Sequence, residues 1–304
     1  MNPSHELTRR ALFGRAAAIL AALAFPRGLA GRPRDPDAER LADWAGTLRA
    51  EGLCESGAPM GRAAVRAGEL AAGSPYEPGM LDAYLQAGGD PLRVEPLKLS
   101  LTRFDCVTLV ESCLGVARAA LHGGAPRWDR FAREVERMRY RGGERRGYAS
   151  RLHYFSEWIE DGGKRGLVKD MGRELGGALD TRPLRFMTGH RERYPALAHD
   201  RVFQAVAARE RELDGRPRRV IPTKRIPEVV DRIQTGDVLA FATAIPGLDV
   251  THAAFAYRDR AGTLRVLHAP LSGGVVEITR TTLPEYVAAI RRATGILVAR
   301  PLRG

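Results

Sequence analysis

Cys106, His252 and His268 are the residues of this sequence best suited to nucleophilic catalysis. A cysteine thiolate can attack a carbonyl carbon, and a histidine can take the thiol proton and return it to the leaving group. A second polar group can hold that histidine in position. Either histidine alone would more often be a structural residue, so the prediction of chemistry depends on the ordered set of Cys, His and His.

The three cysteines differ in what they can do. Cys106 and Cys113 lie seven residues apart in a segment with helical spacing of apolar residues. Seven helical residues rise about 10.5 Å, which exceeds the roughly 7 Å between Cα atoms that a disulfide tolerates. Cys54 could pair with either of them, or all three could be free thiols. Cys113 is expected to be a small buried hydrophobic residue.

Cys106 is predicted to begin a helix, directly after Asp105. The first turn of a helix has unpaired backbone N–H groups and the positive end of the helix dipole, and both favour an anion. We therefore expect the helix start to lower the pKa of the Cys106 thiol and to offer donors for an oxyanion.

The two histidines fall in a C-terminal region of short β-rich segments separated by turn residues. His252 begins one predicted strand, and His268 lies near the end of the next. Alternation along antiparallel strands predicts that both histidines lie toward the same end of this hairpin. The predicted strands are residues 237–243, 251–258, 263–269, 275–279 and 295–299.

These elements predict an α+β fold in which the helix of Cys106 packs on a C-terminal antiparallel sheet. N-terminal helices precede this core, and a helical insertion is expected at about residues 125–220. A further helix over 282–292, with Tyr286 among the residues at helical spacing, is expected to join the last strand.

The N-terminus has the features of a signal peptide of the twin-arginine type. Arg9 and Arg10 precede an apolar run at 16–25, which is too short for the roughly 20 residues of a membrane span. Gly28 and Ala30 supply small residues for cleavage. We expect residues 1–30 to be removed, 31–304 to form a single domain, and the protein to be exported, most simply to the periplasm. A buried N-terminal helix is the alternative.

The sequence is basic, with a net charge of +12 over 304 residues. Loss of the expected leader, with four arginines and one glutamate, would leave +9. A basic surface suits anionic partners, although most of the arginines are expected to be solvated. There is no nucleic-acid-binding signature and no later segment that resembles a membrane span.

Several motifs together resemble a known group of enzymes. Residues 73–76, 104–106, 249–255 and 267–269 resemble the NlpC-type papain-fold cysteine peptidases of the cell wall. A closer resemblance is to the N-acetylmuramoyl-L-alanine amidase-like family, once a domain of unknown function. That resemblance rests on residues 105–111, 148–158, 245–249 and 294–296, and it departs at 77–79 and is thin over 162–220.

The resemblance implies roles for particular residues. Cys106 would be the nucleophile, His252 the general base and acid, and His268 the orienting group. Tyr76 would line the oxyanion side, and no metal or other cofactor is implied. Asp105 and the segment 148–158 would shape the substrate site, with Arg151 and His153 as its polar candidates. Arg151 could offer a fork for a peptide carboxylate, or the segment could instead form an amphipathic helix that buries Leu152, Phe155 and Ile159.

The expected substrate is therefore peptidoglycan or a muropeptide, cut at the amide between N-acetylmuramic acid and L-alanine. The alternatives are a γ-D-glutamyl endopeptidase of the same fold, a thiol acyltransferase, and a catalytically silent wall-binding module. A zinc site of Cys106, His252 and His268 is chemically allowed, but no CxxC or HExxH spacing supports it.

Overall fold

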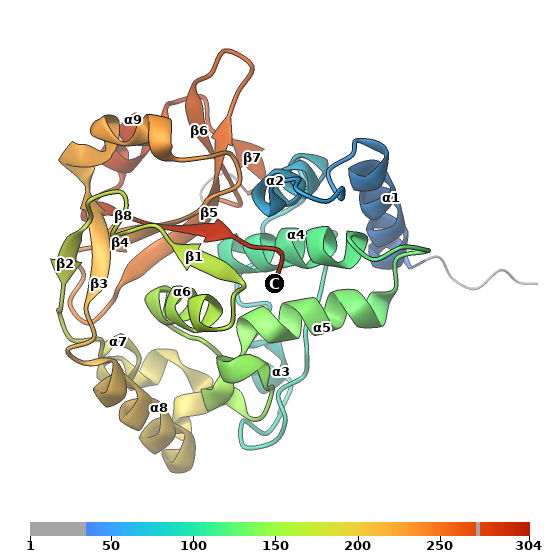
Figure 1. Cartoon of the computed structure of the whole chain (residues 1–304). Helices are drawn as coiled ribbons and strands as arrows, with labels where there is room; N and C mark the ends of the chain where they lie inside the picture. The colour runs from blue at the N-terminus through green and yellow to red at the C-terminus, as the bar shows by residue number, and fades with distance from the viewer. Residues whose placement is uncertain (1–34, 272–273) are drawn as a thin grey trace, which may run out of the picture. The chain divides into compact units, whose positions relative to one another are not determined.

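The computed structural model describes residues 35–271 and 274–304, and the expected leader lies outside these residues. Figure 1 shows the chain from its N-terminus in blue to its C-terminus in red. Within the described ranges, no helix has the length and apolar character needed to cross a membrane.

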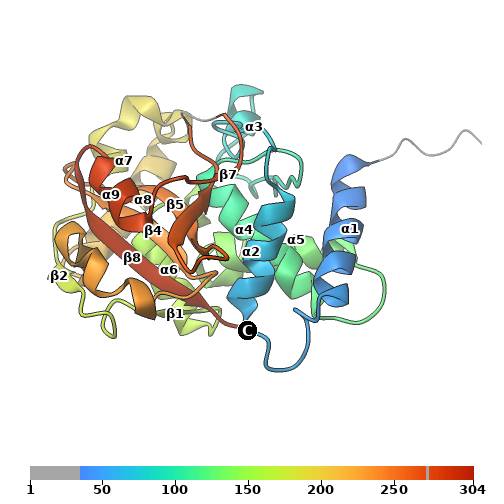
Figure 2. The same ribbon diagram turned by 90° about the horizontal axis from the view of Figure 1, so that it is seen from above.

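Helices form the first half of the described chain. Asp35 caps α1 by accepting from the backbone N–H groups of Asp37 and Ala38. Views from two directions show α1, α2, α4 and α5 grouped together beside the sheet (Figures 1 and 2). The helices here are α1 (Pro36–Ala50), α2 (Met60–Leu70), α3 (Ala83–Gln86), α4 (Cys106–Ala120) and α5 (Trp128–Arg139).

An antiparallel sheet forms most of the second half, in the order β2-β3-β8-β4-β5-β6-β7, and β1 pairs with β8 as well. All of its pairings are antiparallel, as the predicted meander requires. The strands are β1 (Val168–Asp170), β2 (Ala178–Asp180), β3 (Arg218–Pro222), β4 (Val238–Thr243), β5 (Val250–Arg258), β6 (Leu264–His268), β7 (Glu277–Ile278) and β8 (Ala293–Pro301).

The central strands bury both of their faces. In β4, Val238 and Ala240 belong to the core shared with α4, whereas Leu239 and Phe241 belong to a second core on the other face. This alternation follows from the two-residue period of a strand. The second core is closed by α9 (Leu283–Ala289), which begins with a capping box between Thr282 and Glu285.

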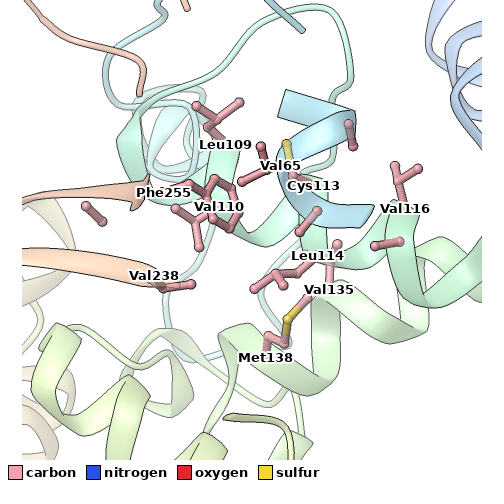
Figure 3. Close-up of a cluster of buried hydrophobic side chains, with 14 of the residues drawn as sticks. Val65, Leu109, Val110, Cys113, Leu114, Val116, Val135, Met138, Val238 and Phe255 are labelled. Carbon is pink, nitrogen blue, oxygen red and sulfur yellow. The ribbon is translucent and has the colours of Figure 1, made fainter. Parts of the chain in front are cut away.

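Helix α4 lies in the centre of the first core and packs against α1, α2, α5 and β5. Figure 3 shows its apolar side chains meeting residues of the helices and of the sheet. Because α4 is covered on all sides, almost every residue after its first turn is buried, including Cys113. The labelled residues are Val65, Leu109, Val110, Cys113, Leu114, Val116, Val135, Met138, Val238 and Phe255.

The predicted strands and the helix beginning at Cys106 are confirmed within one to three residues, except that the strand predicted over 275–279 shortens to Glu277–Ile278. The predicted α+β class with an antiparallel sheet is confirmed too. Residues 125–220 contain helices but also supply β1, β2 and part of β3 to the sheet. The remaining helices are α6 (Phe155–Lys164), α7 (Phe186–Gly189) and α8 (Asp200–Leu213).

Candidate active site

Asp105 fixes the start of α4. Its Oδ1 accepts from the backbone N–H of Thr108 at 2.7 Å and from the Thr108 hydroxyl at 2.9 Å, while the Asp105 N–H donates to Thr108 Oγ1 at 2.8 Å. This capping box satisfies donors that a helix start otherwise leaves unpaired. The carboxylate is thus used for capping and does not line the cavity beside Cys106.

Cys106 follows this cap, in the first turn of α4. Burial, and then the negative charge of Asp105, raise the pKa of its thiol to about 12. The backbone N–H groups of Ala253, Val107 and Cys106 act in the opposite direction but do not offset the burial. The expectation of a lowered thiol pKa is therefore wrong for this state, because desolvation outweighs the helix start.

The two predicted histidines meet each other. Nε2 of His252, on β5, lies 2.8 Å from Nδ1 of His268, on β6. The hydroxyl of Tyr286, on α9, lies 3.2 Å from the same His268 nitrogen. The His252 ring also stacks on Phe241 at 5.5 Å between ring centres. Because Nε2 of His252 is engaged in this way, Nδ1 is its nitrogen left for another partner.

Both imidazoles are neutral at pH 7. Burial and the neighbouring His268 lower the pKa of His252 to about 3. Burial alone lowers the pKa of His268 to about 4. The site therefore combines a neutral thiol with two neutral imidazoles. Within the part of the chain that the structure describes, no side-chain hydrogen bond joins Cys106 to His252.

Cys106 and His252 line one cavity of about 140 Å³. Its walls come from β5, from the loop before β5 and from the start of α6. They are largely apolar, and His153, Asp249 and Thr251 contribute polar groups in addition to Cys106 and His252. The other lining residues are Val107, Leu152, Phe155, Trp158, Leu248, Val250 and Ala253.

Asp249 holds two walls of this cavity together. Its Oδ2 accepts from the backbone N–H of Ser156, at the start of α6, at 2.8 Å. Its Oδ1 accepts from the backbone N–H of Val250 at 2.7 Å. The carboxyl thus ties the beginning of α6 to the beginning of β5. Burial raises its pKa, and the Ser156 and Val250 donors partly counter that rise.

His153 and Arg151 lie in different surroundings. His153 lines the cavity, and its Nε2 lies 3.0 Å from the Tyr148 carbonyl oxygen. The guanidinium of Arg151 is not free to form a fork with a substrate carboxylate, because it is buried against two carboxylates. It contacts Asp82 at 2.6 Å and Glu95 at 3.1 Å. The charge that a substrate would use is already neutralised.

Tyr76 lies beside Cys106 without lining the cavity. Its segment pairs in parallel with Phe104, and its N–H donates to the Gly274 carbonyl at 2.8 Å. Burial, followed by electrostatic interaction with the ionisable groups of Cys106 and Asp105, raises the pKa of the Tyr76 hydroxyl to about 12. The phenol therefore keeps its proton and can donate.

Tyr286 and Glu277 lie near the site and were not predicted to belong to it, whereas Trp158, which lines the cavity, falls in the segment 148–158 that was expected to shape the substrate site. Tyr286 was expected only to pack in its helix. Glu277 lies on the two-residue strand β7, which pairs His268 with Glu277. A strand was predicted over 275–279, but its register against the strand of His268 was not, so the pairing of Glu277 with His268 is seen only in the folded chain.

The two histidine rings contact each other through His252 Nε2 and His268 Nδ1, which leaves His252 Nδ1 and His268 Nε2 as their remaining nitrogen atoms. Over residues 35–271 and 274–304, no group of three or more His, Cys, Asp or Glu side chains is placed to hold a metal ion.

Comparison with known proteins identifies the family. The family model described as AmiA-like, N-acetylmuramoyl-L-alanine amidase-like, matches residues 66–296. The chain belongs to this family. That match confirms the closer of the two resemblances found in the sequence. A search of curated proteins gave no match.

Solved structures agree with membership of the AmiA-like family. An N-acetylmuramoyl-L-alanine amidase from Bacteroides uniformis is 27% identical with a TM-score of 0.73, over 80% of this chain and 99% of that one. A candidate xylanase from Bacteroides fragilis is 32% identical with a TM-score of 0.70, over 77% and 99%. A Legionella pneumophila protein, 19% identical with a TM-score of 0.63 over 87% and 94%, shares the fold.

Proposed function

We propose that this AmiA-like protein is a cysteine amidase that hydrolyses the amide between N-acetylmuramic acid and L-alanine in peptidoglycan fragments. The observation that carries the proposal is the cavity shared by Cys106 and His252, with His268 bonded to the far nitrogen of His252. Nucleophile, base and orienting group are the parts of a cysteine acyl-transfer site. The same arrangement supports placing the fold with the NlpC-type, papain-like enzymes.

The reaction begins when the Cys106 Sγ–H proton passes to Nδ1 of His252 and Sγ attacks the amide carbonyl carbon. The carbonyl π electrons move to oxygen, where the Tyr76 hydroxyl and the N–H groups at the start of α4 can donate. When the C–N bond breaks, the His252 imidazolium gives its proton to the leaving amine. Water then attacks the thioester while His252 takes its proton, and the C–S bond breaks to restore the thiol.

The cavity does not suit glycoside hydrolysis, which requires two carboxyl groups facing the scissile bond. Among the described residues that line the cavity, Asp249 is the only one with a carboxyl side chain. Both oxygens of that carboxyl group already accept hydrogen bonds from backbone N–H groups. A catalytically silent binding module would not need a cysteine and two histidines at positions 106, 252 and 268, nor would it need them close together.

Substitution of the two reacting groups tests the proposal. Cys106→Ala and His252→Ala should each lower the release of peptide from a defined muropeptide by at least 1,000-fold, whereas EDTA should leave the wild-type rate unchanged. Cys113→Ala is the matched control, since this second cysteine of α4 is buried away from the cavity. Activity that survives in either active-site variant would rule the mechanism out.

Product masses decide which bond is cut. Cleavage at the proposed amide releases a peptide that begins with L-alanine, whereas a γ-D-glutamyl endopeptidase leaves L-alanine and D-glutamate on the sugar. An acyltransferase would give a new amide when an amine acceptor is added.

We further propose that residues 1–30 direct export to the periplasm and that 31–304 form one amidase domain.

A further inference from the structure

His268 has one ring nitrogen without a hydrogen-bond partner. Its Nε2 is buried and unpaired among the described residues, whereas its Nδ1 faces both His252 and Tyr286. The nearest carboxylate oxygen is Oε1 of Glu277, at 3.7 Å. That distance is too long for a hydrogen bond, but the Glu277 side chain is half exposed, so it can rotate toward the nitrogen.

The neutral histidine pair can hold its protons in two ways. In the first, His268 carries its proton on Nε2, and His252 Nε2–H donates to His268 Nδ1. The lone pair of His252 Nδ1 is then free to accept the thiol proton. In the second, His268 Nδ1–H donates to His252 Nε2, the His252 proton sits on Nδ1, and the base has no lone pair to offer Cys106.

The groups around His268 favour the first arrangement. A carboxylate can only accept, so Glu277 stabilises a proton on His268 Nε2. The Tyr286 hydroxyl keeps its proton, because burial and the Glu277 charge raise its pKa to about 12. It can therefore donate to an unprotonated His268 Nδ1. The backbone keeps the Glu277 carboxylate within reach of His268 Nε2, because β6 and β7 pair these two residues directly.

We propose that Glu277 is a positioning residue of the active site, and that together with Tyr286 it sets the tautomer of His268 and hence leaves Nδ1 of His252 ready to take the thiol proton. The chain of contacts runs from the Glu277 carboxylate through His268 and His252 to Cys106. This inference rests on the proposed function for its catalytic consequence, but the tautomer itself can be observed without activity.

Nitrogen NMR of histidine-labelled protein is the direct test. Long-range proton–nitrogen spectra at pH 7 should show His268 and His252 protonated at Nε2 in the wild type. In Glu277→Gln, whose amide can donate as well as accept, a second population with protonated Nδ1 should appear. Tyr286→Phe should shift the balance in the same direction.

Kinetics complete the test. In Glu277→Gln, kcat/KM should fall roughly 10- to 100-fold, the loss usual when a group that orients a functional histidine is removed, with Tm within a few degrees. Glu228→Gln, an exposed change on another part of the surface, is the control and should match the wild type. Glu277→Asp should recover part of the rate.

Two results would overturn the inference. One is a wild-type His268 protonated at Nδ1, which can be seen even if no variant folds. The other is a Glu277→Gln protein with unchanged tautomers, whether its rate is unchanged or falls together with Tm. If the wild type shows the expected tautomers but cleaves no muropeptide, the proposed function fails while the assignment of Glu277 stands.

Discussion

His268 lies where burial disfavours its charged form. Its pKa of about 4 in the folded chain is below the ordinary value of about 6.5. Between these values the unfolded chain binds more protons than the folded one, so the free energy of unfolding falls as the pH drops below 6.5. Burial thus keeps the His268 imidazole neutral and lowers the free energy of unfolding in acid.

Acid stability should therefore depend on His268. Between pH 7 and pH 5, the wild type should lose about 2 kcal/mol more of its unfolding free energy than His268→Gln, since each pH unit costs about 1.4 kcal/mol for one such group. Urea unfolding at the two pH values measures this difference. His199→Gln, at an exposed position, should lose as much as the wild type; an equal loss in His268→Gln would contradict the assignment.

At the scale of single residues, the sequence predicted contacts that depend on local geometry. Cys106 at a helix start and His252 beside His268 follow from spacing alone. The role of Arg151 could not be predicted, because its partners Asp82 and Glu95 come from segments 69 and 56 residues away. The raised thiol pKa also depends on how much protein covers Cys106, which spacing does not show.

At the scale of elements, a buried ion pair joins α4 to α5. Arg139 Nε lies 2.7 Å from Glu111 Oε2, and both side chains are 2% exposed. Arg139 also donates to the Lys98 carbonyl oxygen at 2.6 Å. Each charge is tolerated inside the protein because the other neutralises it. The pair thereby fixes the register between α4 and α5.

Breaking this pair should destabilise the fold. Glu111→Ala leaves the Arg139 guanidinium buried and unpaired, and we expect the free energy of unfolding to fall by about 3–5 kcal/mol. Arg133→Ala, which removes an exposed pair with Asp129 one turn earlier on α5, should cost less than about 1 kcal/mol. Urea unfolding of the two variants measures both losses. Similar losses would show that the buried ion pair contributes no more to the free energy of unfolding than the exposed one.

Elements were predicted best where the pattern is long. Strands β4, β5 and β8 are buried runs with clear turns around them, and α4 has both apolar spacing and a cap. The three-residue strands β1 and β2 are too short to show a period. Their place at the edge of the sheet is decided by pairing with β8 and β3, so the segment 125–220 could be predicted only as helical.

At the scale of the whole molecule, two glycines let the helices approach the sheet. A methyl group added at Gly61, in α2, would lie 2.9 Å from the backbone of Gly236, in the turn before β4. Gly236 itself has φ of 89°, a conformation that favours glycine. The backbones of the two layers are therefore in direct contact at this point.

Gly61→Ala should force these layers apart and lower the free energy of unfolding by about 1–3 kcal/mol. Gly46→Ala is the matched control, because a methyl group there meets nothing within 4 Å. It should raise stability by about 0.5–1 kcal/mol, through the better helix propensity of alanine. Calorimetric melting separates the two effects, and a stabilised Gly61→Ala protein would disprove the close contact.

The burial of the Cys106 thiol has a consequence for its oxidation. Peroxide and other oxidants react with thiolates, and the products beyond sulfenic acid do not revert without dedicated repair. A thiol whose pKa burial raises to about 12 holds almost no thiolate at neutral pH. On the mechanism proposed above, the nucleophile is thus sheltered from oxidants while no substrate is bound.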